Sequence, residues 1–293
     1  NQITIRSLLD MRSGLPGLCA TGSHPNYELD LCPYSVHWSG GNLTPVQNQL
    51  DACINREIAE TGVIQAWYSG ERVWEKDYLL YSNCDAQVLG ELLFRATGKD
   101  LQSFADINLF SKIGFEGLWW RDNENNGQSD GNYLAYCCLD ATARDFAKFG
   151  QLILNMGSWG DEQIVSSSYI ENIKNIGVDS VVEEDGSYYS YGIGFWTLDP
   201  FQQDDGTVFP LANKILLAAG TDGQYLIIDF ENNMVLVRNS LYYPMLASFD
   251  RKMIATGDLN AINYPQTLPL GWFGYYSSFH PSVFLYLVSK SLN

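Results

Sequence analysis

The sequence predicts an α+β fold in which a mostly helical amino-terminal part precedes an antiparallel sheet. Apolar residues recur at helical spacing in several segments up to residue 175. From residue 190 the chain changes to short β-rich runs separated by turns rich in Asp, Asn and Gly. With 293 residues, of which 46% are hydrophobic, the chain is long enough to bury a sizeable core in one domain or two lobes.

Helices are predicted from apolar spacing and from residues that begin or end a helix. A first helix over residues 3–12 ends at Gly14 and Pro16, and Thr44-Pro45 begins a second that runs to about Glu60. Asp140 or Thr142 can cap the helix with the broadest apolar face. The further helices are predicted over residues 85–97, 101–111, 140–156 and 166–175.

The β-rich runs predict three antiparallel strands preceded by a lead-in strand. They span residues 192–198, 214–219, 224–230 and 234–239. The sequence therefore divides into a mostly helical lobe, residues 1–189, and the carboxy-terminal part of a sheet lobe, residues 190–293.

The charge of the chain argues against some partners. A formal charge of -17, from 34 acidic and 17 basic residues, disfavours nucleic acid and anionic membranes, which need clustered Lys and Arg. No apolar run approaches about twenty residues, so no membrane span is predicted. The acidic composition fits a secreted or periplasmic protein, with any export signal on an amino-terminal part that precedes Asn1.

The six cysteines, Cys19, Cys32, Cys53, Cys84, Cys137 and Cys138, include no Cys-x-x-Cys pair, and the chain has only three histidines. This disfavours a zinc site and leaves disulfides or buried thiols. We favour disulfides, with Cys19–Cys32 as the best bridge because both residues flank a loop rich in Gly, Pro and Asn. Cys84 is predicted to pair with Cys137 or Cys138.

The candidate catalytic element is Tyr81-Ser82-Asn83, which fits a Tyr-x-Asn pattern. A three-letter pattern with one free position is common by chance, so its flanks decide its weight. No serine in the sequence is followed three residues later by lysine. The chain thus has a candidate proton-transfer element without a Ser-x-x-Lys nucleophile.

Several segments around this element resemble serine hydrolases of the β-lactamase/penicillin-binding-protein superfamily. These are Ile3–Leu15, which resembles the segment after the catalytic helix, Ile107–Phe115, the Thr-Ala-Arg-Asp helix start at Thr142–Asp145, and Leu217–Gln224 in the place of the third motif. The resemblance covers most of residues 1–240 and is closest to the class C-like branch of esterases, amide hydrolases and 6-aminohexanoate-dimer hydrolases. It implies a β-lactamase/transpeptidase-like fold, with an antiparallel sheet flanked by helices, a mostly helical lobe and a terminal helix from about Pro281 to Leu292.

The resemblance also implies that part of the fold lies outside this sequence. In this superfamily, two strands and the helix with the nucleophile precede the segment that resembles residues 3–15. Without these strands an apolar sheet edge would stay open, and such an edge favours aggregation or pairing with another chain. We therefore expect a companion amino-terminal chain or fragment as a partner.

The resemblance assigns chemistry to the Tyr-x-Asn element. A serine hydroxyl is a poor nucleophile at neutral pH, and a nearby lysine or tyrosine must take its proton. Beside a lysine, Tyr81 would act as general base in acylation and as acid to the leaving group, while Asn83 would orient the lysine or the substrate amide. The alternative is structural: Tyr81 packs at a helix start, and Asn83 caps that helix.

The third motif departs from the pattern of the superfamily. Where β-lactamases carry Lys-Thr-Gly or His-Thr-Gly, this chain has Ala218-Ala219-Gly220, so a substrate carboxylate would lose its cationic anchor. This favours small-molecule esters or amides without that carboxylate. The predicted substrate and oxyanion region comprises Gly220, Thr221, Asp222, Gly223 and Tyr136, although residues 220–223 fit an ordinary turn equally well. No cofactor and no metal are expected.

Two functional hypotheses remain open at the level of sequence. In the first, the protein is a serine hydrolase that acts through an acyl-enzyme, with its Ser-x-x-Lys on a separate or missing amino-terminal segment. In the second, it is a noncatalytic binding or scaffold protein on the same fold. We prefer the hydrolase, because a scaffold has no physical need for both Tyr81 and Asn83.

Overall fold

A computed structural model describes residues 3–15, 49–54, 65–67, 72–74, 79, 82–119, 121, 131–176, 181–182, 188–189, 191–198, 201–202, 208–209, 215–220, 224–239 and 281–291. The chain forms two compact units, each built from segments that are separate in sequence. The first unit comprises residues 1–106, 118–140 and 244–263, and the second comprises residues 107–117, 141–243 and 264–293. The lobes proposed for residues 1–189 and 190–293 stay a prediction.

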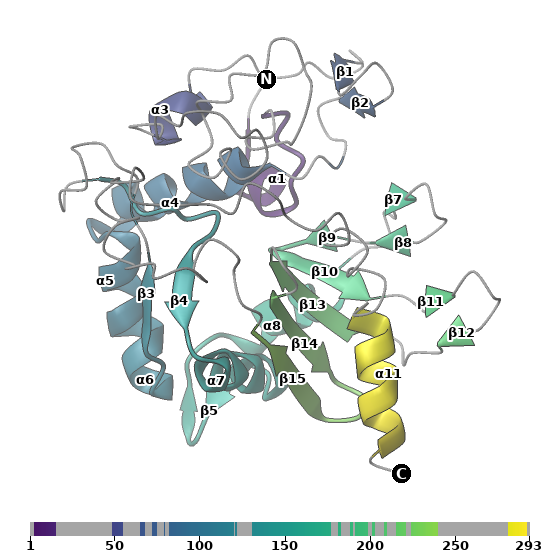
Figure 1. Cartoon of the computed structure of the whole chain (residues 1–293). Coiled ribbons are helices and arrows are strands. Elements are labelled where there is room, and N and C mark those ends of the chain that lie inside the picture. The colour runs from purple at the N-terminus through teal and green to yellow at the C-terminus, as the bar shows by residue number, and fades with distance from the viewer. Residues whose placement is uncertain are drawn as a thin grey trace, which may run out of the picture. The chain divides into compact units, whose positions relative to one another are not determined.

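The second unit is organised around a five-stranded antiparallel sheet with the strand order β15-β14-β13-β10-β9 (Figure 1). Its strands are β9 (Tyr191–Gly192), β10 (Phe195–Leu198), β13 (Ile215–Gly220), β14 (Gln224–Asp229) and β15 (Met234–Arg238). The last three follow one another along the chain and pair as neighbours, with Ile215 opposite Asp229 and Asp229 opposite Met234. This confirms the predicted antiparallel sheet.

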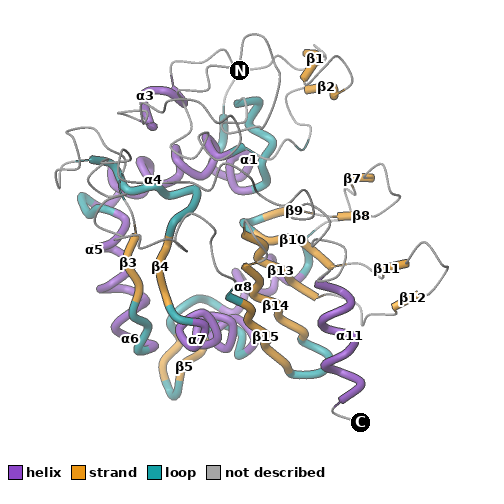
Figure 2. Tube along the Cα trace, viewed as in Figure 1, coloured by secondary structure: helices purple, strands orange, loops and turns teal. Residues whose placement is uncertain are grey.

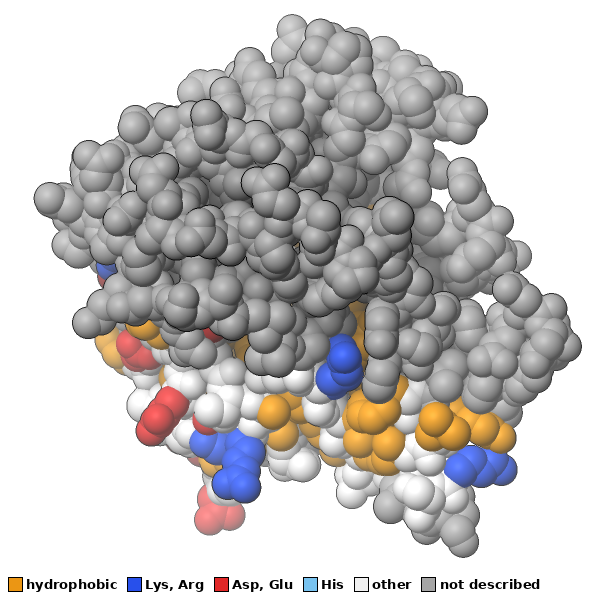
Figure 3. Space-filling view, viewed as in Figure 1, with side chains coloured by type: hydrophobic (Ala, Val, Ile, Leu, Met, Phe, Trp, Pro, Cys, Tyr) orange, Lys and Arg blue, Asp and Glu red, His pale blue; other side chains and the backbone are white. Residues whose placement is uncertain are grey.

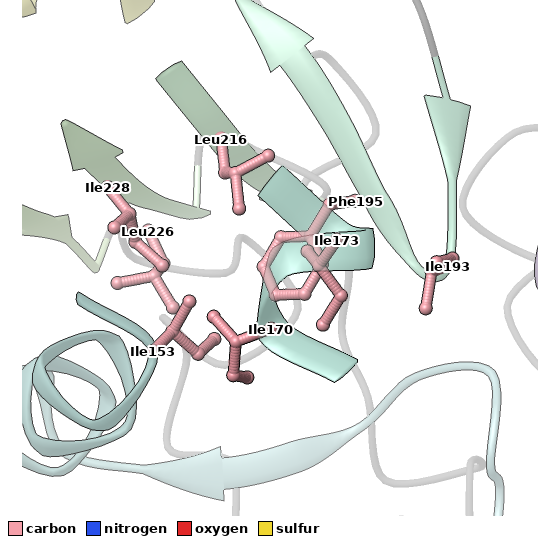
Figure 4. Close-up of a cluster of buried hydrophobic side chains, with 8 residues drawn as sticks. All are labelled: Ile153, Ile170, Ile173, Ile193, Phe195, Leu216, Leu226 and Ile228. Carbon is pink, nitrogen blue, oxygen red and sulfur yellow. The ribbon is translucent and has the colours of Figure 1, made fainter. Parts of the chain in front are cut away.

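One face of the sheet packs against helices α7 (Ala143–Leu154) and α8 (Ser167–Lys174). Side chains alternate along each strand, so Leu216, Leu226 and Ile228 point to this face. Figure 4 shows them directed toward Ile153 of α7 and Ile170 of α8. These buried aliphatic contacts hold the two helices on the sheet.

The opposite face of the sheet is covered by the terminal helix α11 (Pro281–Ser291), as the resemblance implied. The strand residues that alternate with those of the first face, including Ile215 and Ile227, point to this face. They pack with Leu285, which is 1% exposed. Helices therefore flank both faces of the sheet, with α7 and α8 on one side and α11 on the other (Figure 2). The predicted fold class is confirmed.

The predicted lead-in strand over residues 192–198 is in fact a hairpin. Ile193 has φ 47° and Gly194 has φ 82°, and these two residues turn the chain so that β10 runs back along β9. Glycine readily takes a positive φ, whereas a β-branched isoleucine rarely does. Because isoleucine is typical of strands, the sequence pattern predicted one continuous strand in place of this turn.

The first unit contains α1 (Ile5–Leu9), α3 (Gln49–Ile54) and α4 (Asn83–Thr97). Thr4 caps α1 in a capping box with Ser7, and α4 ends at Gly98, whose φ of 67° suits a residue without a side chain. Helix α3 lies within the predicted helix from Thr44 to Glu60, whose predicted cap Thr44 lies outside the described residues.

The remaining elements are short. The predicted helix over residues 101–111 begins as α5 (Leu101–Ala105), continues through a π-helical turn (Asp106–Phe110) and ends as α6 (Ser111–Ile113). Two-stranded pairs complete the described structure: β1 (Gln65–Trp67) with β2 (Arg72–Trp74), β3 (Gly117–Trp119) with β4 (Leu139–Ala141), β5 (Ser158–Trp159) with β6 (Glu162–Gln163), β7 (Val181–Val182) with β8 (Tyr188–Tyr189), and β11 (Phe201–Gln202) with β12 (Val208–Phe209).

Helix α7 begins later than the predicted helix over residues 140–156, because residues 139–141 form strand β4. Thr142 is its cap, with the threonine hydroxyl accepting a hydrogen bond from the Asp145 N–H at 3.2 Å. The helix also approaches the sheet closely, since a Cβ on Gly150 would lie 2.6 Å from Cγ1 of Val235. Glycine at this position lets the α7 backbone rest directly on β15.

Candidate active site

The Tyr-x-Asn element lies at the start of α4. Tyr81 lies outside the described residues, whereas Ser82 occupies the N-cap position and Asn83 is the first helical residue. The capping role that the structural alternative gave to Asn83 is therefore wrong, whereas its packing role for Tyr81 stays a prediction. Asn83 is half-buried at the amino-terminal end of α4, where helix geometry fixes the direction of its Cα–Cβ bond.

The residue between the two candidate catalytic side chains is completely buried. Ser82 is 0% exposed, and its N–H donates to Sδ of Met11 at 3.5 Å. Met11 has φ 54° and lies two residues after the end of α1, so the segment that resembles the family sequence over residues 3–15 contacts the start of α4. The backbone that bears Asn83 is thus held by a segment about 70 residues away in sequence.

A buried carboxyl group makes a second contact between the same two segments. The Ser13 hydroxyl donates to Oδ1 of Asp85 and accepts a hydrogen bond from the Leu15 N–H at 2.9 Å. Burial raises the pKa of Asp85 to about 7, although hydrogen bonds from Ser13 oppose this change. Asp85 therefore titrates near neutral pH two residues after Asn83.

A disulfide between Cys53 and Cys84 joins α3 to α4, with Cα atoms 5.2 Å apart. Both residues are 0% exposed and pack with Leu8 and Leu15 in the core of the first unit. The prediction that Cys84 pairs with Cys137 or Cys138 is wrong. The predicted Cys19–Cys32 bridge lies outside the described residues.

Gln87 holds a loop against the same face of α4. Its side-chain amide donates to the carbonyl of Tyr133 at 2.9 Å and accepts from the N–H of Ala135 at 3.0 Å. Gln87 is four residues after Asn83, so both lie on one side of the helix. One turn further, a Cβ on Gly90 would lie 2.7 Å from the Ala135 Cβ, which shows how closely the loop approaches α4.

We call residues 131–138 the α4 loop, because Gln87 fixes it to that helix. Arg121 also contacts this loop: its guanidinium lies 4.1 Å from the Tyr133 ring centroid and donates to the Tyr133 hydroxyl at 2.8 Å. Tyr136, one of the predicted substrate-region residues, is a half-buried member of this loop. In the first unit, therefore, Asn83 begins α4 and the loop that contains Tyr136 packs against the same helix.

The α4 loop ends in a second disulfide, between the adjacent residues Cys137 and Cys138. Cys138 has φ 70°, in the left-handed region that disfavours side chains. Both cysteines are half-buried, in contrast to Cys53 and Cys84.

The predicted third motif belongs to the second unit. Gly220 is the last residue of β13 and pairs with Gln224 across the sheet, while Thr221, Asp222 and Gly223 lie outside the described residues. A Cβ on Gly220 would lie 3.0 Å from the Gln224 Cβ. Ala219 and Gly220 are exposed at the strand end, so this backbone presents neither a cation nor a hydroxyl side chain of its own.

The other carboxylate with a strongly changed pKa stabilises a helix start. Burial opposes ionisation of Asp145, but hydrogen bonds from Lys148, Thr142 and the Glu116 N–H lower its pKa to about 2. The Lys148 ammonium also donates to the carbonyl of Gly114. These contacts join α7 to the end of α6 and account for Asp145 without a catalytic role.

The described residues contain no group of three or more His, Cys, Asp or Glu arranged to hold a metal ion. None of their helices has the length and apolar character needed to cross a bilayer. On the face drawn in Figure 3, acidic, basic and hydrophobic side chains lie close together in the described part.

Three residues that matter for this arrangement escaped the sequence analysis: Ser13, Asp85 and Gln87. Each lies in a segment whose pattern predicts a helix or its end, where polar residues usually face solvent. The only sequence signal was their place beside the family-like segments, since Ser13 lies in residues 3–15 and the other two follow the Tyr-x-Asn element.

Comparison with known proteins identifies a family and a fold. The Beta-lactamase family model matches residues 1–242. A solved structure from Bacillus anthracis, assigned as a 6-aminohexanoate-dimer hydrolase, is 22% identical with a TM-score of 0.53, and the match covers 87% of this chain and 58% of that one. EstCE1, described as a hydrolase with promiscuous acyltransferase activity, is 15% identical with a TM-score of 0.56, over 78% of this chain and 64% of that one.

These structural likenesses show the fold, and this chain spans about six tenths of the length of both proteins. The comparison with curated proteins found no match.

Proposed function

The chain belongs to the beta-lactamase family, and we propose that it is a serine hydrolase that cleaves esters or amides through an acyl-enzyme. In this proposal Tyr81 transfers the proton, Asn83 orients the activating lysine or the substrate amide, and Gly220 to Gly223 border the oxyanion site. The sequence holds no Ser-x-x-Lys pair. The nucleophile is therefore assigned to an amino-terminal segment outside this sequence, as a companion chain or fragment.

The observation that carries the proposal is the way the start of α4 is held. Contacts from Met11 and Ser13, together with the Cys53–Cys84 disulfide, fix the backbone on both sides of Asn83. A catalytic side chain needs such support, because a displacement of about 1 Å can lower a rate substantially. A binding scaffold has no comparable need for a firmly held Asn83.

The third motif supports a substrate without a carboxylate anchor. Ala218 and Ala219 precede Gly220, so the first two places of the motif offer neither a positive charge nor a hydroxyl group. An uncharged ester or amide loses nothing at such a site, whereas an anionic β-lactam loses an ion pair. The disulfides of the first unit support a secreted or periplasmic location, since such bridges persist in oxidising compartments.

The test begins with intact mass spectrometry of the native material under denaturing, reducing conditions, followed by labelling with a fluorophosphonate. We expect a second polypeptide that carries Ser-x-x-Lys and the label. The native material should hydrolyse an uncharged aryl ester faster than a carboxylated β-lactam. A lone 32.9 kDa species with neither label nor hydrolysis would contradict the proposal and indicate a noncatalytic binding protein.

Variants test the assigned roles in the same material. Y81F removes the proton-transfer group, and we expect kcat to fall about 100-fold or more. Y169F is the matched control, because Tyr169 lies on α8 and is 41% exposed. If both variants keep native activity, Tyr81 has no catalytic role.

A further inference from the structure

The two disulfides within the described residues differ in how easily a reagent can reach them. Cys53 and Cys84 are 0% exposed and lie in the core of the first unit. Cys137 and Cys138 are half-buried at the end of the α4 loop. Thiol–disulfide exchange needs a thiolate to approach a sulfur atom, so the Cys137–Cys138 bridge is the more accessible of the two.

They also differ in what they can stabilise. Cys53–Cys84 closes a sequence separation of 31 residues, which restricts the unfolded chain strongly. Cys137–Cys138 joins neighbours and closes the smallest ring that two residues can form. Because this ring barely restricts the unfolded chain, its effect is confined to the local backbone of the folded protein.

The local backbone has a conformation that needs support. Cys138 has φ 70°, which disfavours any residue with a Cβ and persists only where surrounding structure enforces it. On its amino-terminal side, the α4 loop is fixed by Gln87 at Tyr133 and Ala135. The disulfide ring is the covalent constraint at the other end, directly after Tyr136.

We propose that Cys137–Cys138 is a site of reversible thiol–disulfide exchange with a dithiol, and that its redox state controls the conformation of the α4 loop. A thiolate of the dithiol attacks one sulfur and forms a mixed disulfide, while the other cysteine leaves as a thiolate and takes a proton. The second thiol of the dithiol then displaces the first cysteine. The dithiol ends as a cyclic disulfide, and both cysteines end as thiols.

Reduction opens the ring and leaves the φ of Cys138 without its covalent constraint. The backbone from Tyr136 to Cys138 can then relax, while Gln87 still holds the earlier part of the loop and Leu139 stays in strand β4. The consequence for catalysis, through Tyr136 at the substrate region, rests on the proposed function. The exchange reaction and the change in the loop conformation are independent of the proposed function.

Differential alkylation tests the exchange directly. The oxidised full chain is treated with low concentrations of dithiothreitol, quenched with iodoacetamide and digested for peptide mass spectrometry. We expect Cys137 and Cys138 to be alkylated at least about tenfold faster than Cys53 and Cys84, which react only after a local opening. Equal rates, or earlier reaction of Cys53 and Cys84, would overturn the assignment.

Hydrogen exchange and a matched pair of variants test the effect on the loop. Reduction should increase exchange several-fold in a peptide over residues 136–142 but not in α7. C137S/C138S should resemble the reduced protein, whereas C137S/C138G should resemble the oxidised protein, because glycine accepts the φ of residue 138 without a ring. The proposal fails if reduction leaves exchange unchanged or if the two variants behave alike.

Activity is read separately from these measurements. If the hydrolase is active, reduction should change KM or kcat for the aryl ester, and C137S/C138G should not respond to dithiothreitol. Unchanged activity together with selective alkylation and altered exchange would keep the redox site and remove its link to catalysis. An inactive protein that shows both effects would contradict only the proposed function.

Discussion

The hydroxyl of Ser13 donates a hydrogen bond to the carboxyl group of Asp85 across 72 residues of sequence, and each residue is only 1% exposed. The interaction joins the segment after α1 to the first turn of α4, two residues beyond Asn83. A carboxyl group in such surroundings is costly to ionise, because burial removes the hydration of the charged form while the hydrogen bonds from Ser13 restore only part of the loss. The stability of the contact beside Asn83 is thereby linked to pH.

The first prediction concerns the pH dependence of stability. The pKa of Asp85 is raised from 3.8 to about 7 in the folded protein, so its contribution to stability is full below about pH 4 and is lost as pH rises through 7. D85N keeps an acceptor for Ser13 and cannot titrate. Relative to the native protein, D85N should gain up to about 1.4 kcal/mol per pH unit between pH 4 and 7 and then stay level.

Urea unfolding from pH 2 to 8 measures this difference, and D145N is the control. The pKa of Asp145 is lowered to about 2, so its contribution is present above about pH 4 and is lost as pH falls through 2. D145N should therefore differ from the native protein in its pH profile only below pH 4. A pH-independent difference between D85N and the native protein would show that Asp85 does not titrate in this window.

A second prediction concerns the two disulfides. C53A/C84A should lower the free energy of unfolding by roughly 3–4 kcal/mol, because the bridge spans a separation of 31 residues. C137S/C138S is the control and should lower it by less than about 1 kcal/mol, since a ring between neighbours barely restricts the unfolded chain. Similar losses in the two variants would show that burial and loop length do not distinguish the bridges.

A third prediction concerns the amide of Gln87, which is 3% exposed and contacts backbone groups of Tyr133 and Ala135. Q87A leaves a carbonyl and an N–H without this partner, and each buried unsatisfied group costs about 1–3 kcal/mol. We expect a loss of about 2 kcal/mol or more in chemical unfolding, together with faster exchange of the Ala135 amide hydrogen.

Gln151 supplies the control for Q87A. Its side chain donates to Asn155 at 2.9 Å on the exposed side of α7, so Q151A should change stability by less than about 0.5 kcal/mol. If Q87A is as mild as Q151A, water replaces the amide and the α4 loop does not depend on Gln87.

The sequence predicted the elements whose stability comes from regular burial. Successive residues of β13 and β14 point to opposite faces of the sheet, and helices cover both faces. Both faces are therefore apolar, which the sequence shows as the continuous apolar runs Ile215–Leu217 and Tyr225–Ile228. The long helix α4 followed in the same way from its apolar spacing, within two residues at its start.

Contacts between distant segments could not be predicted in the same way. Six cysteines allow fifteen pairings, so their spacing alone could not select Cys53 as the partner of Cys84. Gln87 and Asp85 read as ordinary polar helix residues, because their burial depends on segments that fold over them. The hairpin at Ile193 was missed because a β-branched residue at positive φ violates the local preference on which the prediction relied.

The last prediction tests the contact between α4 and its loop at one methyl group. A Cβ on Gly90 would lie 2.7 Å from the Ala135 Cβ, closer than two carbon atoms can pack. Alanine favours a helix over glycine by about 1 kcal/mol, yet G90A should still lose about 1–3 kcal/mol, because the loop must move away. Removing the opposing methyl group in G90A/A135G should recover most of that loss. Thermal or urea unfolding of the native protein, both single variants and the double variant gives the coupling energy, which we expect to exceed about 1 kcal/mol. Additive effects of the two substitutions would mean that the loop does not rest on Gly90.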